Sequence, residues 1–305
     1  MAVPGAPDDG AYRGRVPPPL VLAVDVGGTK VAAGWVDRAG VLTGRRQVPT
    51  PAGTDPEALF ATVAGLVDAV RAEGPVPAAV GVGCGGPMER TDGEPTVSPL
   101  NIPAWRRFPL ERRLAEHVGR PAAVDNDAKA LALGEGWVGA AAGVRDFLAM
   151  VVSTGVGGGI VLDGRLLDGA AGNAGHIGHV VVEPQGRDCP CGARGCLEAE
   201  ASGTAIAAVT GAPAAEAPPE VRARTGRLVG RAVASVANLL DLRLACLSGS
   251  VALGFGEDLL AAARAEVAAS ARLDFSRGTE VRLGGLGPSG PLVGAGAVGW
   301  RLLDG

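Results

Sequence analysis

The chain twice follows a short apolar run with a glycine-rich turn and a second apolar run. The first copy, Leu20–Asp37, reads LVLAVDVGGTKVAAGWVD, and the second, Asp146–Leu162, reads DFLAMVVSTGVGGGIVL. Short apolar runs interrupted by glycines predict a strand, a turn and a second strand. The dipeptide Asp163–Gly164, a hairpin-turn signal, follows the second copy. The repeat therefore predicts two related half-structures, each built on a β-sheet.

The rest of the chain alternates predicted strands and helices, which is typical of an α/β protein. Helical periodicity marks residues 56–73, 110–118, 128–142, 202–209, 222–240, 255–269 and 291–303. Further strands are expected within 41–54 and at 78–82, 121–124, 243–247 and 280–283. A length of 305 residues is enough for two domains. We expect a disordered tail over 1–19, a small α/β domain over 20–125 and a large one over 126–305, whose closing helix could pack back on the small domain.

Charge and composition exclude several classes of protein. The 28 basic and 32 acidic residues give a net charge of −4, and the sequence has no basic run. This balance argues against nucleic-acid binding, which needs clustered Lys and Arg. No apolar run reaches the roughly 18–20 residues of a membrane span, and the N-terminus lacks the apolar region of a secretory signal. We therefore expect a cytoplasmic protein with neither a membrane nor a nucleic-acid partner.

Both glycine-rich turns carry groups suited to binding phosphate. These are Gly27, Gly28, Thr29 and Lys30 in the first turn, and Ser153, Thr154 and Gly155 at the start of the second, which we expect to extend over residues 153–159. Because glycine lacks a Cβ, backbone N–H groups can approach phosphate oxygens closely. Asp25 precedes the first turn and could orient a metal-bound water. An ordinary hairpin with a buried acid remains an alternative there, and the P-loop pattern is absent.

Polar or glycine-rich segments follow two further predicted strands. One is a turn that contains Gly86, at the strand end where open α/β sheets bind ligands. Asn101, in the loop that follows, could reach a polar ligand. Three consecutive polar residues then separate a strand from a helix: Asp125, Asn126 and Asp127. They could simply cap the helix, but three exceed what capping requires, so one carboxylate is a candidate general base. We assign that role to Asp127.

A cluster of soft metal ligands lies between residues 179 and 196. Its members are His179, Cys189, Cys191 and Cys196. Three cysteines with one histidine form a closed tetrahedral zinc set, which is the structural rather than the catalytic pattern. A disulfide is the alternative, but Cys189 and Cys191 are too close for an easy bridge and an odd cysteine would remain. A zinc ion would hold His176, His179 and Glu198 in a fixed array.

Phosphoryl transfer requires the parts that these segments supply. Two phosphate-type turns, an acid for Mg²⁺ at Asp25, a base at Asp127 and a polar loop for a polyol together match that chemistry.

At this point the sequence resembles the ROK family of sugar kinases, within the actin-like ATPase superfamily. The resemblance spans about residues 20–303, and its motifs are DVGGTK at 25–30, DND at 125–127, STGVGGG at 153–159, GHIGH at 175–179 and CPCGARGCLE at 189–198. It implies an actin-like (ribonuclease H-like) two-domain fold with an interdomain cleft, and ATP and Mg²⁺ as cofactors with structural Zn²⁺. It also implies transfer of the γ-phosphoryl group to a hexose hydroxyl, usually on C6. A homodimer or homotetramer is expected.

The resemblance assigns a role to each motif. It makes Asp127 the general base, and gives phosphate binding to Gly27–Thr29 and Thr154–Gly155. The sugar-binding residues that we expect are Gly86, Asn101, Asn126, His176, His179 and Glu198. His179 would bind both zinc and sugar. Gly249 and Ser250 resemble the segment that lines the adenosine pocket.

His176 departs from the pattern of the family's glucokinases, which usually carry Glu there. A carboxylate accepts two hydrogen bonds from a vicinal diol, whereas an imidazole offers one donor or acceptor on each side. The contacts near C1 and C2 of the sugar should therefore differ. GHIGH with STGVGGG is similar to bacterial N-acetylmannosamine kinases, in which an acyl group is carried at C2. A passive packing role for His176 is the alternative.

Two non-kinase functions occur or are conceivable within the same family. ROK transcriptional repressors carry an added N-terminal helix-turn-helix domain, whereas only a short Pro/Gly-rich segment precedes the first strand here. DNA binding is therefore not expected. A non-catalytic sugar sensor is the second alternative, and the presence of Asp25, Thr29, Asp127 and Thr154 argues against such a degenerate site.

Overall fold

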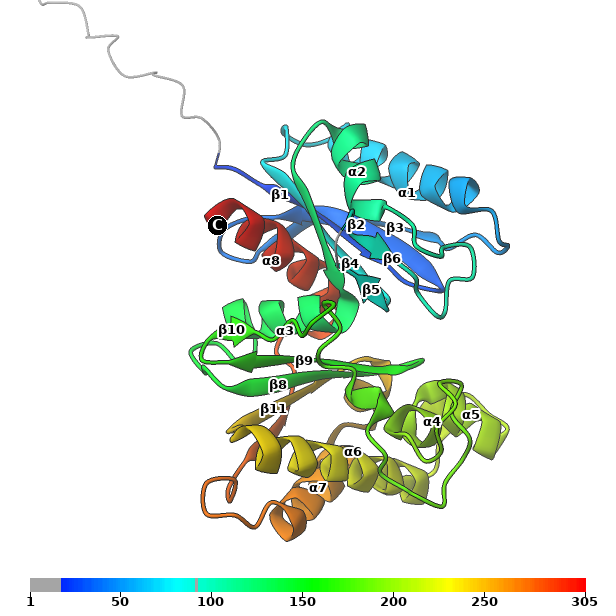
Figure 1. Cartoon of the computed structure of the whole chain (residues 1–305), viewed down its shortest axis with the longest axis vertical. Helices are drawn as coiled ribbons and strands as arrows, with labels where there is room; N and C mark the ends of the chain where they lie inside the picture. The colour runs from blue at the N-terminus through cyan, green and yellow to red at the C-terminus, as the bar shows by residue number, and fades with distance from the viewer. Residues whose placement is uncertain (1–17, 91–92) are drawn as a thin grey trace, which may run out of the picture.

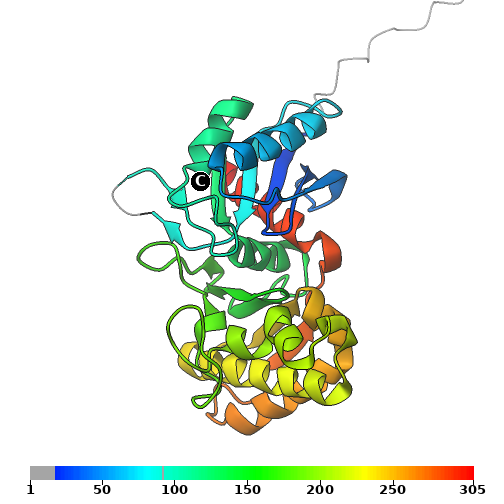
Figure 2. The same cartoon turned by 90° about the vertical axis from the view of Figure 1, so that its right-hand side faces the viewer.

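The computed structural model describes residues 18–90 and 93–305, so the predicted tail over 1–19 lies almost wholly outside the described residues. It shows an α/β fold with two five-stranded mixed sheets, each covered by helices (Figure 1). The first sheet occupies the upper part of the molecule in Figure 1 and the second sheet the lower part, and the view turned by 90° shows the same division (Figure 2).

The first sheet has the strand order β3–β2–β1–β4–β7. Strand β1 (Val21–Val26) pairs antiparallel with β2 (Lys30–Val36), which pairs antiparallel with β3 (Leu42–Pro49). On its other side β1 pairs parallel with β4 (Ala79–Cys84), and β4 pairs parallel with β7 (Ala122–Asn126). The three parallel strands therefore end at the same edge of the sheet.

The second sheet repeats this plan in the order β10–β9–β8–β11–β12. Strand β8 (Phe147–Val152) pairs antiparallel with β9 (Val156–Leu162), which pairs antiparallel with β10 (Arg165–Leu166). It also pairs parallel with β11 (Leu244–Ser248), and β11 pairs parallel with β12 (Glu280–Leu283). The predicted pair of related half-structures is confirmed by this repeated order.

The second glycine-rich turn is shorter than the sequence suggested. Val156–Gly159 were expected to belong to the turn, but they form the start of β9 and pair in register with Val152–Ala149 of β8. Only residues 153–155 lie between the two strands. Glycines therefore occupy a paired strand here, and the reason is the close approach of a helix described below.

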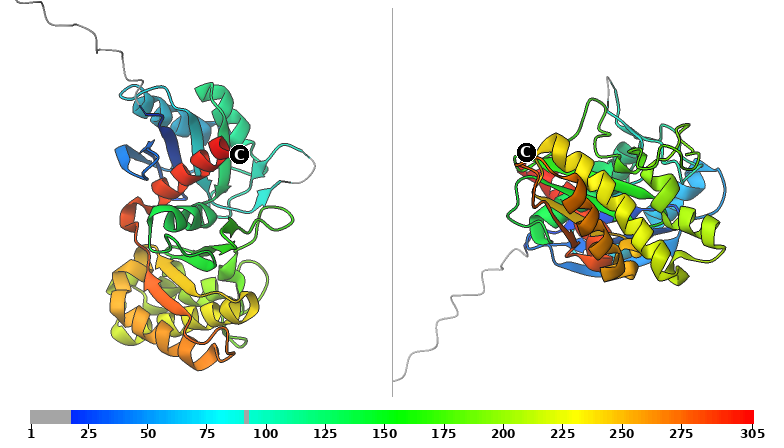
Figure 3. Two further views of the ribbon diagram at one scale, coloured as in Figure 1. Left: turned by 90° about the vertical axis from the view of Figure 1, so that its left-hand side faces the viewer. Right: turned by 90° about the horizontal axis from the view of Figure 1, so that it is seen from below.

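Helices cover the outer faces of both sheets. Helices α1 (Pro56–Arg71) and α2 (Leu110–Val118) pack on the first sheet, where they share a core with alternate residues of β1. Helices α6 (Pro219–Leu240) and α7 (Ser250–Ser270) lie side by side against the second sheet (Figure 3). Helix α7 begins five residues before the predicted start at 255.

Two helices lie between the sheets. Helix α3 (Asp127–Val138) contacts β8 and β9, and α8 (Gly290–Asp304) contacts β1 and β4, while the two helices also pack on each other (Figure 1). Glycine permits this packing: a β-carbon placed on Gly294 would lie 2.5 Å from the Ala130 carbonyl oxygen. The half-structures are therefore joined through helix backbones in direct contact.

Short elements complete the chain. They are β5 (Met88–Glu89), β6 (Thr96–Val97), η1 (Ile177–His179), α4 (Leu197–Ala201), α5 (Gly203–Thr210), η2 (Ala214–Glu216) and η3 (Gly287–Ser289). Within the described part of the chain, none of the helices combines the length and apolarity that crossing a bilayer would require.

Candidate functional site

The turn after β1 leaves two backbone donors free. The Gly27 N–H donates to the Lys30 carbonyl at 3.0 Å, and the Thr50 hydroxyl donates to the Gly27 carbonyl at 2.6 Å. Gly27 thus closes the turn and has no donor left for a ligand. The N–H groups of Gly28 and Thr29 have no acceptor within residues 18–90 and 93–305. Consecutive free N–H groups of this kind form an anion-binding concavity.

The turn after β8 has the same character. The Ser153 N–H donates to the Gly155 carbonyl at 2.9 Å, while the N–H groups of Thr154 and Gly155 find no acceptor among the described residues. The start of α7 lies against this turn: the hydroxyls of Ser153 and Ser250 are 2.9 Å apart. Gly249 has φ +94° and adjoins Val152, where a β-carbon would lie 2.5 Å from the carbonyl oxygen. The structure thus brings Gly249 and Ser250 next to the second turn.

The carboxylates of Asp25 and Asp127 lie on either side of Gly83 in β4. Asp25 of β1 and Asp125 of β7 are both in register with Gly83, and Asp127 follows β7 two residues later. A β-carbon on Gly83 would lie 3.6 Å from the Asp127 Cα and 3.8 Å from the Asp25 Oδ1. Because glycine adds no side chain there, Asp25 and Asp127 approach each other at the edge where the parallel strands end. This is the edge at which α/β sheets bind ligands.

Both carboxyl groups hold protons more tightly than usual. Burial, and then the charge of Asp127, raise the pKa of Asp25 to about 7, against the lowering effect of Lys30 and Arg45. Desolvation by the surrounding protein also raises the pKa of Asp127, although His176 lowers it in part. The Asp127 side chain nevertheless remains exposed to solvent. Asp127 is therefore an accessible carboxylate with increased proton affinity, which suits a general base.

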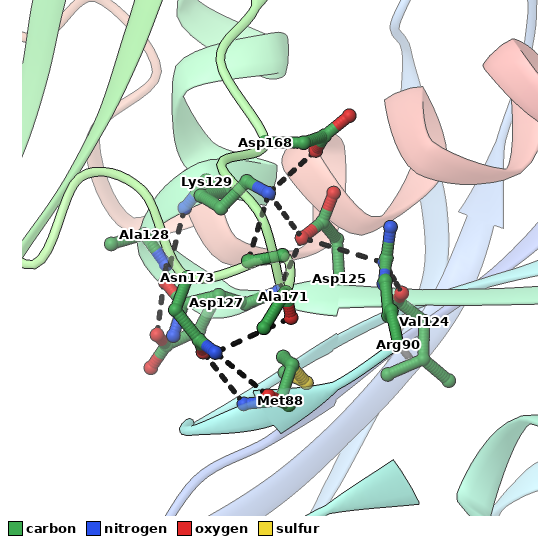
Figure 4. Close-up of polar contacts among 12 residues, drawn as sticks. Met88, Arg90, Val124, Asp125, Asp127, Ala128, Lys129, Asp168, Ala171 and Asn173 are labelled. Atoms are coloured by element: carbon green, nitrogen blue, oxygen red, sulfur yellow. Dashed lines mark hydrogen bonds and ion pairs between the residues drawn. The ribbon is translucent and has the colours of Figure 1, made fainter. Parts of the chain in front are cut away.

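The neighbours of Asp127 carry structural duties. The Asn126 Oδ1 caps α3 by accepting from the N–H groups of Ala128 and Lys129, at 3.0 and 3.3 Å. Asp125 is buried and lies 3.3 Å from the Lys129 ammonium (Figure 4). Capping and ion pairing thus account for two of the three consecutive polar residues. The Asn126 Nδ2 stays directed at Gly86, 3.2 Å from where a β-carbon there would lie.

His176 lies next to the Gly86 turn. Its Nε2 would be 3.4 Å from a β-carbon on Gly86, and this nitrogen is buried without a hydrogen-bond partner in the described chain. Burial lowers the pKa of His176, helped by the nearby His179 and opposed by Asp127 and Glu198. The imidazole is therefore neutral at pH 7, with one donor and one acceptor nitrogen.

Asn101 and Glu198 contact the two turns. The Asn101 side chain lies 2.9 Å from where a β-carbon on Gly28 would be. The Glu198 Oε2 accepts from the Val156 N–H at 2.9 Å and would lie 2.7 Å from a β-carbon on Gly155. The sequence placed Glu198 with the sugar alone. The structure gives it an additional contact with the second turn.

The cysteine cluster is assembled as expected. The ligand atoms of His179, Cys189, Cys191 and Cys196 all lie within 4.8 Å of one another. The Cys191 and Cys196 sulfurs are 3.8 Å apart, and the three thiols are free. A Zn–S bond of about 2.3 Å in a tetrahedron places two sulfurs about 3.8 Å apart, whereas a disulfide needs about 2.05 Å. The donor set and its spacing fit a zinc ion and exclude the disulfide alternative.

Sequence reasoning missed a buried network beside Asp127. The Lys129 ammonium is 1% exposed and pairs with Asp168 at 2.7 Å, and Asn173 bonds to Met88 nearby (Figure 4). A lysine among the buried alanine and leucine residues of the first half of α3 was the available signal.

Comparisons with known proteins identify the family and the fold. A model of the ROK family matches residues 21–299. An N-acetylmannosamine kinase of Citrobacter koseri is 37% identical over 250 residues, which cover 77% of this chain and 84% of that protein. A ROK hexokinase from Thermus thermophilus is similar in structure, with a TM-score of 0.78, 35% identity, and coverage of 94% of this chain and 100% of that one. A ROK family glucokinase from Streptomyces griseus, solved with glucose and AMPPNP, gives a TM-score of 0.80 and 32% identity, over 92% and 99% of the two chains.

Replacement of a zinc-site thiol should release metal and destabilise the protein. We expect Cys196→Ser to lose the bound zinc and to lower Tm by roughly 5–10 °C, because metal binding contributes directly to folding free energy. Metal analysis and thermal unfolding of purified protein measure both effects. Cys246→Ser is the matched control, since Cys246 is buried in β11 outside the cluster, and it should retain zinc. A zinc-free wild-type protein would contradict the assignment.

Replacement of Asp25 should stabilise the protein at alkaline pH. A folded-state pKa of about 7 exceeds the unfolded value of about 3.9. The folded state therefore binds an extra proton between these values, and stability is lost as pH rises through 7. Asp25→Asn should raise Tm more at pH 8 than at pH 5, in protein without nucleotide or magnesium. The exposed Asp274, replaced in the same way, should show no such difference. An equal Tm shift at both pH values would count against the burial of this charge.

Proposed function

The chain belongs to the ROK family and is a carbohydrate kinase, and we propose that it transfers the γ-phosphoryl group of ATP to the C6 hydroxyl of a hexose or N-acylhexosamine. The observation that carries this proposal is the convergence of Asp25, Asp127 and His176 at one strand edge between two turns with free N–H groups. These are the positioning, charge and proton-accepting groups that phosphoryl transfer requires.

Asp127 would act as the general base. Its carboxylate is accessible to solvent, and its raised pKa makes it a stronger proton acceptor than an ordinary aspartate. It lies at the first turn of α3, which is fixed by the Asn126 cap and the Lys129 ion pairs. A sugar hydroxyl placed against Asp127 would give its proton to the carboxylate as its oxygen attacks the γ-phosphorus, while the bond from that phosphorus to the β,γ-bridging oxygen breaks and ADP leaves.

The two turns would bind the phosphates. Free N–H groups on Gly28 and Thr29, and on Thr154 and Gly155, supply donors from both half-structures. Asp25 would help to hold Mg²⁺, since carboxylate oxygens are preferred ligands of that ion. Bound Mg²⁺ supplies neutralisation of charge on the β- and γ-phosphates. The exposed Lys30 adds a positive charge at the same end of β1.

The sugar would lie among the groups near Gly86. Candidate ligands are the Asn126 amide, the His176 imidazole, Asn101, Glu198 and the His179 nitrogen not used for zinc. His176 Nε2 and Asn126 Nδ2 both adjoin Gly86. A neutral imidazole at this point offers a single donor or acceptor rather than the two acceptors of a carboxylate. This favours an acylamino group over a free hydroxyl at C2.

Glucose is the second candidate substrate. The Streptomyces griseus glucokinase, solved with glucose and AMPPNP, is 32% identical over nearly its full length. An ADP-release assay over glucose, mannose, fructose, N-acetylglucosamine and N-acetylmannosamine separates the candidates. We expect the highest kcat/KM with N-acetylmannosamine. Sugar binding without ADP release from any of the five would instead indicate a sensor.

Removal of the proposed base should abolish most turnover. We expect Asp127→Asn to lower kcat by roughly 10²–10⁴-fold, the usual size of a general-base contribution. In the wild type, kcat should fall as pH drops through the raised pKa of Asp127, because the base becomes protonated. Asp274→Asn, at an exposed position after α7, is the control and should keep wild-type kcat. Near-normal turnover by Asp127→Asn would refute the assignment.

A further inference from the structure

The side-chain amide of Asn173 makes a two-way pair with the backbone of Met88, and its Nδ2 also donates to the Ala171 carbonyl at 3.3 Å. The Met88 N–H donates to the Asn173 Oδ1 at 2.8 Å, and the Asn173 Nδ2 donates to the Met88 carbonyl at 2.7 Å. A side-chain amide carries a carbonyl and an N–H₂ group in one plane, as a peptide unit does. The Asn173 side chain therefore makes with Met88 the two hydrogen bonds that a neighbouring strand would make at the edge of β5. Met88 itself is only 2% exposed.

This pair joins the two segments that flank the proposed sugar site. Met88 follows Gly86 by two residues, and Asn173 precedes His176 by three. The Gly86 side is held independently, because the Leu100 N–H donates to the Gly86 carbonyl at 3.1 Å. Asn173 thus connects the segment carrying His176 to a segment that is already fixed.

The Asn173 segment is also anchored to the helix that carries Asp127. The Lys129 ammonium donates to the Gly172 carbonyl at 3.1 Å and to Asp168 at 2.7 Å (Figure 4). Burial alone would raise the pKa of Asp168, but the Lys129 hydrogen bond and charge outweigh it and lower that pKa. Gly172, with φ +84°, would bring a β-carbon within 3.0 Å of the Arg90 side chain. Residues 168–173 are therefore held between α3 and β5.

We propose that Asn173 is a positioning residue that sets the distance between His176 and the Gly86 turn, and thereby the affinity for sugar. His176 Nε2 adjoins Gly86 and Asn126, yet no hydrogen bond of that nitrogen to any described residue holds it there. Its place follows from the backbone at 173–176, which the Met88 pair holds at Asn173 and the close packing of Gly175 on Gly158 holds next to His176. The nucleotide turns depend on other contacts, such as Val156 with Glu198. This inference rests on the proposed function of the same site.

The sharpest test is Asn173→Asp. Aspartate keeps the shape of asparagine and the acceptor for the Met88 N–H, but it places a carboxylate oxygen against the Met88 carbonyl. We expect the Kd for sugar, measured by calorimetry without ATP, and the KM for sugar to rise about tenfold. The KM for ATP should change less than about twofold. Asn173→Ala, which removes the pair without adding charge, should shift the same constants in the same direction and serves if the aspartate variant does not fold.

Asn238→Asp is the matched control. Asn238 is similarly half-buried and makes two tertiary hydrogen bonds, to the Ser270 carbonyl at 3.2 Å and from the Ser276 hydroxyl at 2.6 Å, within the α6–α7 region. The Asn238→Asp variant should have a lower Tm than the wild type and an unchanged Kd and KM for sugar.

The outcomes separate this inference from the proposed function. An unchanged sugar Kd in both Asn173 variants, or equal increases in the KM values for sugar and ATP, would overturn the positioning role while leaving the kinase assignment intact. A wild-type protein that binds none of the five sugars would overturn the proposed function itself, and the inference with it.

Discussion

Helix α3 is the element on which both half-structures depend. Its first residue, Asp127, follows β7 of the first sheet directly, while its body lies on β9 of the second. Glycines make this contact possible: β-carbons on Gly157 and Gly159 would each lie within 2.9 Å of α3 atoms. The glycine run of the second motif therefore serves helix packing as well as the turn. Because α3 rests on both sheets, its N-terminus is fixed at the edge of the first sheet where Asp25 and Asp127 approach each other.

The site concentrates groups that weaken the fold. Burial and the charge of Asp127 raise the pKa of Asp25, and desolvation raises the pKa of Asp127. The cysteine-rich loop that carries His179 and leads to Glu198 is stabilised at two places. The cluster of soft ligands holds one end, and the buried Glu200, paired with Arg224 and Arg187, holds the other. Rigid support around a centre of buried charge keeps its side chains in productive geometry.

The sequence predicted those features that depend on residues close together along the chain. The repeated strand–turn–strand plan and the metal cluster follow from spacing alone, and both appear as expected. Glycine misled the prediction in two places, since the first residues of β9 and of α7 were read as turn or loop. Gly256, with φ +53°, interrupts α7 itself. The contacts of Lys129, Asn173 and Glu198 could not be foreseen. Each joins segments separated by 39–85 residues, and only the packing of α3 and the cysteine-rich loop brings those segments together.

The position of α8 has a consequence for how the chain acquires its structure during synthesis. This last helix covers the face of the first sheet that carries Ala23 and Ala32, and its Gly299 lies against Gly81 of β4. Residues 290–304 leave the ribosome about 270 residues after β1 does. Contacts of such long range close slowly, and the half-structure made first keeps an apolar face uncovered until α8 has been synthesised. The amino-terminal sheet thus completes its core last, and a nascent chain halted before α8 would expose that face to chaperones or to aggregation.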